Sequence, residues 1–93
     1  MIVHLVCLKF RDPGDAEGIA GRLEELPGKI PVIRRLEVGR DVVRSERSYD
    51  LALIVEVDSL DDLDTYRKHP AHVEVGALIA AAADQVAFLD YER

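Results

Sequence analysis

The sequence predicts a single α+β domain, with two helices on one face of an antiparallel four-stranded sheet. Strand-like and helix-like segments follow one another along its 93 residues in the order β-α-β-β-α-β. That order is typical of the ferredoxin-like fold, in which the strands have the spatial order 4-1-3-2 and the crossovers are right-handed. The two strands that this arrangement makes central, residues 1–10 and 49–57, are also the two that are apolar on both faces. We therefore expect one ferredoxin-like domain over residues 1–93, a length within the ~50–200 residues of most domains.

The first strand and the first helix are marked by apolar spacing and by turn residues. Met1–Phe10 is apolar at odd and at even positions, which indicates a strand covered on both faces. Residues 12–15 read Asp-Pro-Gly-Asp, which is turn chemistry with a proline suited to the first turn of a helix. The helix that follows ends at Pro27-Gly28. Its apolar residues at helical spacing are Ile19, Leu23 and Leu26.

Two strands joined by a polar turn come next. Residues 33–43 are expected to form the second strand, in which Leu36, Val38 and Arg40 share a face. Residues 44–48 are polar and should form the turn. The third strand, residues 49–57, is apolar on both parities in its middle, as a central strand would be.

A second helical region and a last strand complete the pattern. Ser59 and Asp62 have the spacing of a capping box at a helix start, where acidic side chains suit the positive end of the helix dipole. Pro70 interrupts this helix because proline disfavours helical geometry in the residue before it. An alanine-rich helical piece is expected over residues 71–83, and the fourth strand over residues 85–91.

Composition and charge limit the classes of partner. Eighteen acidic and 12 basic residues give a formal charge of −6, which disfavours nucleic acid and anionic membranes because both require a basic face. No apolar stretch approaches the ~20 residues that span a bilayer, and Met1–Leu8 is too short for a signal peptide. The single cysteine, Cys7, cannot form an internal disulfide. We therefore expect a cytoplasmic protein that binds neither nucleic acid nor membranes.

The expected topology leaves one face of the sheet without helices. Val3, Leu5 and Cys7 of the first strand would face water there, together with the matching residues of its neighbours. An exposed apolar patch of several hundred Å² is uncommon on a soluble monomer. We therefore predict a homodimer in which two sheets pack face to face as a dimeric α/β barrel.

The three histidines are the main candidates for chemistry. His69 and His72 lie in the stretch 66–73, which reads Tyr-Arg-Lys-His-Pro-Ala-His-Val and places two imidazoles around a helix break. Such irregular backbone allows side chains to converge on a cavity. His4 interrupts an otherwise apolar central strand, where a buried polar group requires a hydrogen-bond partner.

The expected sheet gives His4 such a partner. The first and fourth strands are antiparallel neighbours, and a register with His4 opposite Asp90 makes a His–Asp pair. A carboxylate bonded to one imidazole nitrogen fixes the tautomer and raises the basicity of the other nitrogen. A slip of one residue would separate the pair. The same register aligns apolar residues on the same face, Val6 with Phe88 and Leu8 with Val86.

Four segments of the chain carry a family resemblance: residues 3–10 (VHLVCLKF), 48–53 (SYDLAL), 66–73 (YRKHPAHV) and 90–91 (DY). Together they resemble the Dabb family, the stress-responsive dimeric α/β-barrel domain. The resemblance covers essentially the whole chain, and His-Pro-Ala-His in this context is its most specific part. It implies a ferredoxin-like protomer and a homodimer.

The resemblance also implies roles for individual residues. An enzymatic member of the family, a plant cyclase, closes a linear polyketide by aldol condensation without cofactor or metal. The resemblance places its general base at His72 and its assisting tyrosine at Tyr66, and it matches His4 and Asp90 to further polar positions of the pocket. Where the cyclase has bulky aromatic residues, the first helix offers Ile19, Ala20 and Leu23, so we expect a pocket of different shape.

Each of these residues also has a structural interpretation. His72 is explained equally as a hydrogen-bonded residue at a helix start, and His69 as a cap on the preceding helix through its dipole. His4 and Asp90 are explained as a buried structural pair. Zinc is disfavoured because Pro70 separates the two nearby histidines and catalytic zinc normally takes three protein ligands.

The function that we expect is binding of a small apolar or aromatic-like molecule between sheet and helices, without a cofactor or a metal. Its catalytic form would be acid–base chemistry of the cyclase or isomerase type. Two alternatives stay open, namely a non-catalytic stress or assembly protein whose role is the stable dimer, and a cofactor-free dimeric-barrel monooxygenase. A solvent-connected cavity of a few hundred Å³ at His72 favours binding, and a sealed interior favours assembly. The expected catalytic residues are His72 and Tyr66, and the expected substrate-binding residues are His4, Val6, Leu8, Leu23, Phe88 and Asp90.

Overall fold

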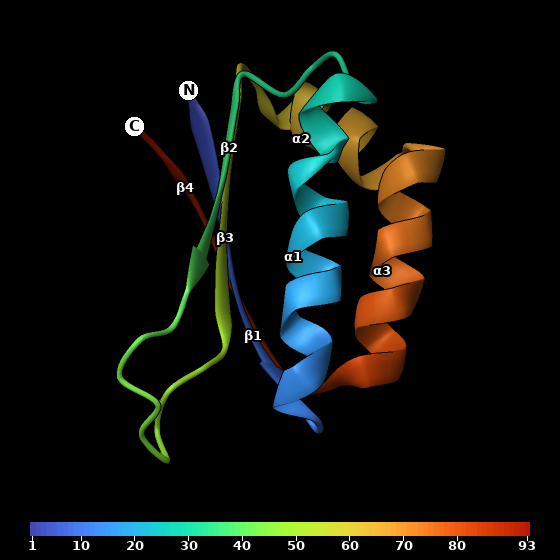
Figure 1. The fold of residues 1–93 in the computed structure, drawn as a ribbon. Coiled ribbons are helices and arrows are strands. Elements are labelled where there is room, and N and C mark those ends of the chain that lie inside the picture. Colours follow the sequence, from blue (N-terminus) through green and yellow to red (C-terminus); the bar gives the residue numbers. More distant parts are fainter.

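The computed structural model describes residues 1–93 as a four-stranded antiparallel sheet with its helices on one face (Figure 1). The strand order β2-β3-β1-β4 is the predicted one and confirms the ferredoxin-like class. No helix combines the length and apolar character that a membrane crossing requires. The strands are β1 (Ile2–Phe10), β2 (Arg35–Arg40), β3 (Leu51–Val57) and β4 (Ala83–Glu92). The helices are α1 (Ala16–Glu24), α2 (Leu60–Lys68) and α3 (Pro70–Ala82), and short 3-10 helices flank α1 at η1 (Pro13–Asp15) and η2 (Leu26–Gly28).

The connection between β2 and β3 is longer than the sequence predicts. The prediction extends β2 to residue 43 and starts β3 at residue 49, whereas the pairing of these strands ends at Arg40 and Leu51. Beyond that pair the chain forms a loop, Asp41–Asp50, closed by a 3.0 Å hydrogen bond from the first N–H to the last carbonyl. Arg44 in this loop has a φ of 58°, a left-handed conformation that a strand cannot contain.

The predicted helix break at Pro70 is confirmed, and His69 caps both helices, because its N–H donates to the carbonyl of Tyr66 at the end of α2 and its side chain caps the start of α3. α2 begins at the predicted cap and ends at Lys68, and α3 begins two residues later, with His69 in extended backbone between them. Nδ1 of His69 accepts a 3.1 Å hydrogen bond from the N–H of Ala71, so the imidazole caps the start of α3.

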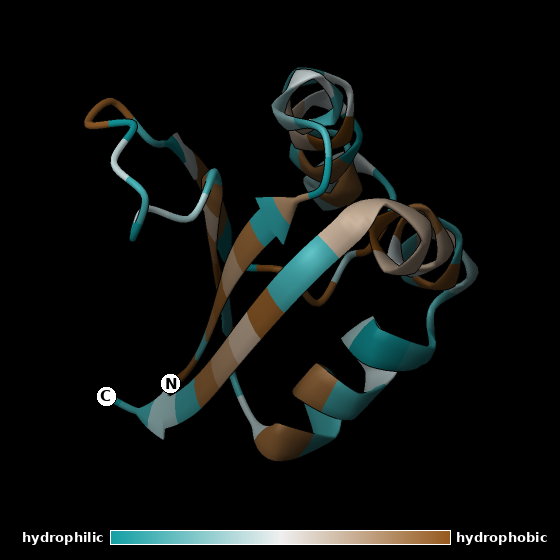
Figure 2. Cartoon of the chain, turned by 90° about the horizontal axis from the view of Figure 1, so that it is seen from below, coloured by the Kyte–Doolittle hydropathy of each residue, from teal (hydrophilic) through white to brown (hydrophobic).

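The core lies between the sheet and the helices and is built over β1 and β3. The even-numbered residues of β1 and the odd-numbered residues of β3 face the helices and are buried. β4 begins at Ala83, earlier than predicted, because α3 leads directly into it, and every later residue of this strand is exposed. Hydrophobic and hydrophilic segments alternate along β4, although none of its residues is buried (Figure 2). Phe88 on its inner face is 68% exposed, and Leu89 on its outer face is 56% exposed.

Candidate functional site

The register of β1 and β4 places His4 opposite Asp90, as the sequence predicts. Their side chains meet on the helix-facing side of the sheet, with His4 Nδ1 2.5 Å from Asp90 Oδ1. The imidazole is 7% exposed and the carboxylate 37% exposed. Because an ionised carboxylate only accepts hydrogen bonds, Nδ1 is the protonated nitrogen, and Nε2 is left for other contacts.

The helix break brings a second histidine to the same region. α3 starts afresh at Pro70, and the N–H of Ala71 is used by His69, so the carbonyl of Arg67 has no backbone donor of the α-helical kind. Nδ1 of His72 donates to that carbonyl at 2.9 Å. Since a carbonyl only accepts, this bond fixes the proton on Nδ1 and leaves Nε2 of His72 as an acceptor.

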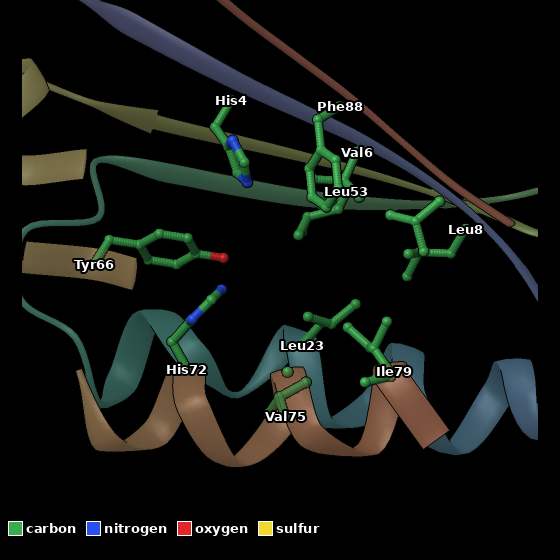
Figure 3. A pocket seen from close by; sticks show the side chains of 13 residues that line it. His4, Val6, Leu8, Leu23, Leu53, Tyr66, His72, Val75, Ile79 and Phe88 are labelled. Carbon is green, nitrogen blue, oxygen red and sulfur yellow. The ribbon is translucent and has the colours of Figure 1, made fainter. Parts of the chain in front are cut away.

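Tyr66 joins the two histidines into one cluster. Its ring centroid lies 4.6 Å from that of His72 and 5.9 Å from that of His4. Figure 3 shows its hydroxyl and a ring nitrogen of His72 directed toward the same space. Tyr66 is fully buried, and its hydroxyl has no hydrogen-bond partner. The three side chains come from β1, α2 and α3, so the tertiary fold assembles the cluster.

The environment fixes the protonation state of two of these groups. Burial raises the pKa of Tyr66 to about 12, so its hydroxyl is protonated at neutral pH. Burial also lowers the pKa of His72 below its usual 6.5, more strongly than its bond to Arg67 raises it. At neutral pH, the cluster therefore has a phenolic hydroxyl that donates beside an imidazole nitrogen that accepts.

The cluster forms the polar end of an otherwise apolar cavity of about 280 Å³. The cavity lies between the sheet and the helices and opens to solvent, and no Lys, Arg, Asp or Glu lines it. The elements that enclose it are β1, β3, β4 and the three helices. The lining residues are His4, Val6, Leu8, Leu23, Leu53, Tyr66, His72, Val75, Gly76, Ile79, Ala80, Val86 and Phe88.

The structure gathers seven of the eight predicted site residues around this cavity. Asp90 is the exception, because it does not line the cavity and reaches it only through His4. Sequence reasoning missed the lining residues on α3, although they lie three, four, seven and eight residues after His72, the spacing of one helix face. It also missed Leu53 of β3, which lies opposite Val6 on the inner face. The missed residues are Leu53, Val75, Gly76, Ile79 and Ala80, whereas Val86 was placed on this face opposite Leu8.

No group of three or more His, Cys, Asp or Glu side chains is arranged to hold a metal ion. The polar end can instead offer one hydroxyl donor and two imidazole acceptors to a bound molecule. The apolar remainder favours a hydrocarbon or aromatic body, since burial of apolar area contributes ~25 cal/mol per Å². A neutral molecule fits better than an anion, because no lysine or arginine side chain lines the cavity.

The fold and the pocket define a ferredoxin-like domain whose helices enclose an apolar cavity against one side of the sheet. The chain belongs to the Dabb family, the Stress responsive A/B Barrel Domain, because the model of that family matches residues 2–93. This confirms the family that the sequence resembles.

Three similar proteins illustrate the family relationship. Olivetolic acid cyclase of Cannabis sativa is 28% identical over 95 residues, which cover 97% of this chain and 94% of the cyclase. A stress-response A/B barrel domain-containing protein of Arabidopsis thaliana is also 28% identical over 95 residues, covering 95% and 82% of the two chains. The solved structure of a dimeric protein with a ferredoxin-like fold from Bacteroides fragilis has a TM-score of 0.88 and 35% identity, covering 99% of this chain and 95% of that one.

Proposed function

We propose that the protein is a homodimer that binds a small, neutral, apolar or aromatic-like molecule in this cavity and catalyses cofactor-free acid–base chemistry on it. The observation that carries the proposal is the fully buried hydroxyl of Tyr66, which has no partner and stands beside the free Nε2 of His72. A buried hydroxyl without a partner costs ~1–3 kcal/mol. A ligand with a carbonyl or hydroxyl group at this end of the cavity would remove that cost.

The proposed reaction begins with removal of a proton α to a carbonyl. Nε2 of His72 takes this proton as general base, and the hydroxyl of Tyr66 donates a hydrogen bond to the developing enolate oxygen. The lowered pKa of His72 keeps the base unprotonated at neutral pH, and the raised pKa of Tyr66 keeps the donor protonated. His4, oriented by Asp90, offers a second acceptor to the polar end of the substrate.

The similarity to olivetolic acid cyclase supports chemistry of the cyclase or isomerase type. Three of the four residues matched to the cyclase, His4, Tyr66 and His72, line one solvent-connected cavity. This favours binding over the alternative, a non-catalytic assembly protein whose role is the dimer alone. No comparable feature favours the monooxygenase alternative.

The homodimer is supported by the face of the sheet that the helices leave open. Its centre holds partly exposed apolar side chains such as Leu5 and Ile54, and its β4 edge holds exposed Leu89. Charged groups flank this centre, for example Glu56, whose carboxylate accepts from Arg35. An apolar centre with a polar rim is the usual anatomy of a protein interface. Similar solved structures from Bacteroides fragilis and Thermobifida fusca are described as dimeric.

A cytoplasmic location is part of the same proposal. The chain has one cysteine, and Cys7 is free in the structure. Disulfides are the usual reinforcement of small secreted domains, so a domain of this size without one fits a reducing compartment.

A thermal-shift screen with phenolic and polyketide-like compounds tests binding. We expect at least one compound to raise the melting temperature of the wild type, and we expect His72→Ala to reduce that shift. The matched control is His69→Ala, because His69 lies three residues away but does not line the cavity. The proposal fails if no compound stabilises the wild type, or if the shift is the same in His72→Ala and in the wild type.

Catalysis is tested separately by exchange of α protons. A ketone that stabilises the protein is incubated in D₂O, and loss of its α-proton signal is followed by NMR. We expect the protein to accelerate exchange, and His72→Gln to abolish the acceleration, because glutamine can still donate to Arg67 but provides no base. Binding without accelerated exchange would reduce the proposal to a binding protein.

A further inference from the structure

The two imidazoles of the cavity come from opposite walls. His4 belongs to β1 of the sheet, and His72 belongs to α3 of the helical layer. Figure 3 shows a ring nitrogen of each directed into the cavity, and the hydroxyl of Tyr66 directed toward the same space. These three are the only polar side chains that line the cavity. A molecule bound at the polar end is therefore within reach of two separate imidazole nitrogens.

The second nitrogen of each ring has a different partner. Nδ1 of His72 donates to the backbone carbonyl of Arg67, which is neutral. Nδ1 of His4 is bonded to the carboxylate of Asp90 at 2.5 Å. A carboxylate balances the positive charge of a protonated imidazole, whereas a carbonyl offers only its dipole. A second proton is therefore accommodated better on His4 than on His72.

The environment also keeps the two rings from being charged together. Burial lowers the pKa of His72, and a positive charge on His4 lowers it further. When His4 is protonated, His72 consequently stays neutral. The pair then consists of one imidazole whose Nε2 donates a proton and one whose Nε2 accepts a proton. Two titratable groups in such different environments are the usual source of a general acid and a general base.

The ring of His4 is held in one orientation. Its side chain is only 7% exposed. Phe88 stacks on it with ring centroids 6.3 Å apart and an interplanar angle of 27°, and Tyr66 meets it edge-on at 5.9 Å. Together with the bond from Nδ1 to Asp90, these contacts leave Nε2 as the nitrogen that faces the cavity.

Tyr66 determines how a carbonyl compound would lie between the two rings. A carbonyl oxygen that accepts from its hydroxyl has the α carbon close to the tyrosine and the γ carbon two bonds further away. The ring centroid of His72 is 4.6 Å from that of Tyr66, and the ring centroid of His4 is 5.9 Å from it. The nearer imidazole, the base, therefore suits the α carbon, and the farther imidazole, the acid, suits the γ carbon.

We infer that His4 is a further catalytic residue, a general acid that makes the protein an isomerase of β,γ-unsaturated ketones. The inference rests on the function proposed above, in which His72 is the base and Tyr66 the hydrogen-bond donor, and it adds the substrate class and the proton donor. Asp90 is a positioning residue, because it acts on the substrate only through His4.

The reaction moves one proton and one double bond. Nε2 of His72 removes the α proton, and the electron pair of that C–H bond enters a dienolate whose oxygen accepts from Tyr66. Nε2 of protonated His4 then gives its proton to the γ carbon, and the double bond moves into conjugation with the carbonyl. Substrate and product have the same composition. His72 has gained the proton that His4 has lost, and water restores both rings after the product leaves through the open side of the cavity.

Conversion of allyl phenyl ketone to propenyl phenyl ketone tests the reaction. The substrate is neutral and aromatic, and the conjugated product is followed by its ultraviolet absorbance. We expect the wild type to accelerate the conversion and, in D₂O, to place deuterium in the new γ-methyl group. Exchange of the α protons without formation of the product overturns this inference alone. Absence of both reactions refutes the proposed catalysis itself.

His4→Asn tests the general acid, because asparagine keeps a donor for Asp90 but supplies no acid. We expect isomerisation to fall roughly 100-fold, and α-proton exchange to fall far less, because the base and the tyrosine are intact. The control is His69→Asn, which keeps a cap for α3 outside the cavity and should change neither rate. Isomerisation at the wild-type rate in His4→Asn overturns the inference, because it would show that His72 alone carries the proton from the α to the γ carbon.

Asp90→Asn tests the same assignment without altering the imidazole. Asparagine still accepts from Nδ1 of His4 but balances no charge. We expect isomerisation to fall roughly 10-fold more than α-proton exchange. The thermal shift that the ketone produces shows that the variant is folded and binds. Isomerisation that is unchanged, or that falls only in parallel with exchange, overturns the inference, because the carboxylate would then have a structural role alone.

Discussion

Replacing Tyr66 by Phe should stabilise the free protein while it weakens ligand binding. Tyr66 is fully buried, and its hydroxyl has no hydrogen-bond partner, so phenylalanine keeps the ring packing and removes an unpaired polar group. The unpaired group costs ~1 kcal/mol at the lower end of the usual range. For a domain of this length, that free energy corresponds to a rise in melting temperature of ~4–8 °C. Calorimetric unfolding of the ligand-free variant and of the ligand-free wild type measures this rise in melting temperature.

The same substitution should reduce affinity for a compound found in the thermal-shift screen. Loss of one neutral hydrogen bond of ~1 kcal/mol raises the dissociation constant roughly 5-fold, measured by isothermal titration calorimetry. Tyr49→Phe is the control, because Tyr49 is a partly buried tyrosine outside the cavity, and neither effect is expected there. A Tyr66→Phe variant that melts below the wild type, or that binds the compound with unchanged affinity, would show that the hydroxyl has a structural partner and no ligand role.

Three further predictions concern the rest of the cavity. Because burial lowers the pKa of His72, the stability that its neutral form contributes is complete above pH ~6.5 and is lost as the pH falls through the folded-state pKa. The free energy of unfolding should therefore depend less on pH in His72→Gln than in the wild type over this range. Parallel pH dependences in the two proteins would contradict this prediction. Asp90→Ala should lower the free energy of unfolding in urea by about 1 kcal/mol, because it leaves Nδ1 of His4 without its acceptor at a site partly open to solvent. Asp90→Asn can still accept a hydrogen bond and should lower it less. Equal losses in the two variants would refute the hydrogen-bond explanation. Ile79→Phe should fill part of the 280 Å³ cavity and abolish the ligand-induced thermal shift while the protein remains folded by circular dichroism, whereas an undiminished shift would place the ligand elsewhere.

The strand part of the site could be predicted because strand geometry is regular. Side chains alternate between faces, and antiparallel partners have a constant index sum, so one assumed pair, His4 with Asp90, determines the others. The sheet shows that register over nearly all of β1, and only Phe10 departs from it through an irregularity near the end of the strand. Val6, Leu8 and Phe88 therefore line the cavity as predicted.

The remaining features depend on tertiary contacts as well as on local patterns. The α3 side of the cavity depends on how far that helix packs from β4, which is set by Pro70 at one end and by the direct connection at Ala83 at the other. The loop Asp41–Asp50 was predicted as a shorter polar turn because the left-handed conformation of Arg44 and its ion pairs with Asp41 and Asp50 are not visible in a pattern of strand propensity. Propensity alone favours extension of the strand through Val42, and the tertiary contacts override it.

The structural and the functional interpretations of His72 are compatible, because one hydrogen bond serves both. The break at Pro70 deprives the carbonyl of Arg67 of its helical donor, and a carbonyl at a helix end needs another partner. Nδ1 of His72 supplies the missing donor, and in doing so it fixes the tautomer in which Nε2 accepts. Tyr66, one turn before the end of α2, then provides a donor directly beside that acceptor. An imidazole that only completed the backbone hydrogen bonding would not need a fully buried, unpaired hydroxyl next to it, so the hydroxyl of Tyr66 is the feature that supports the proposed ligand site.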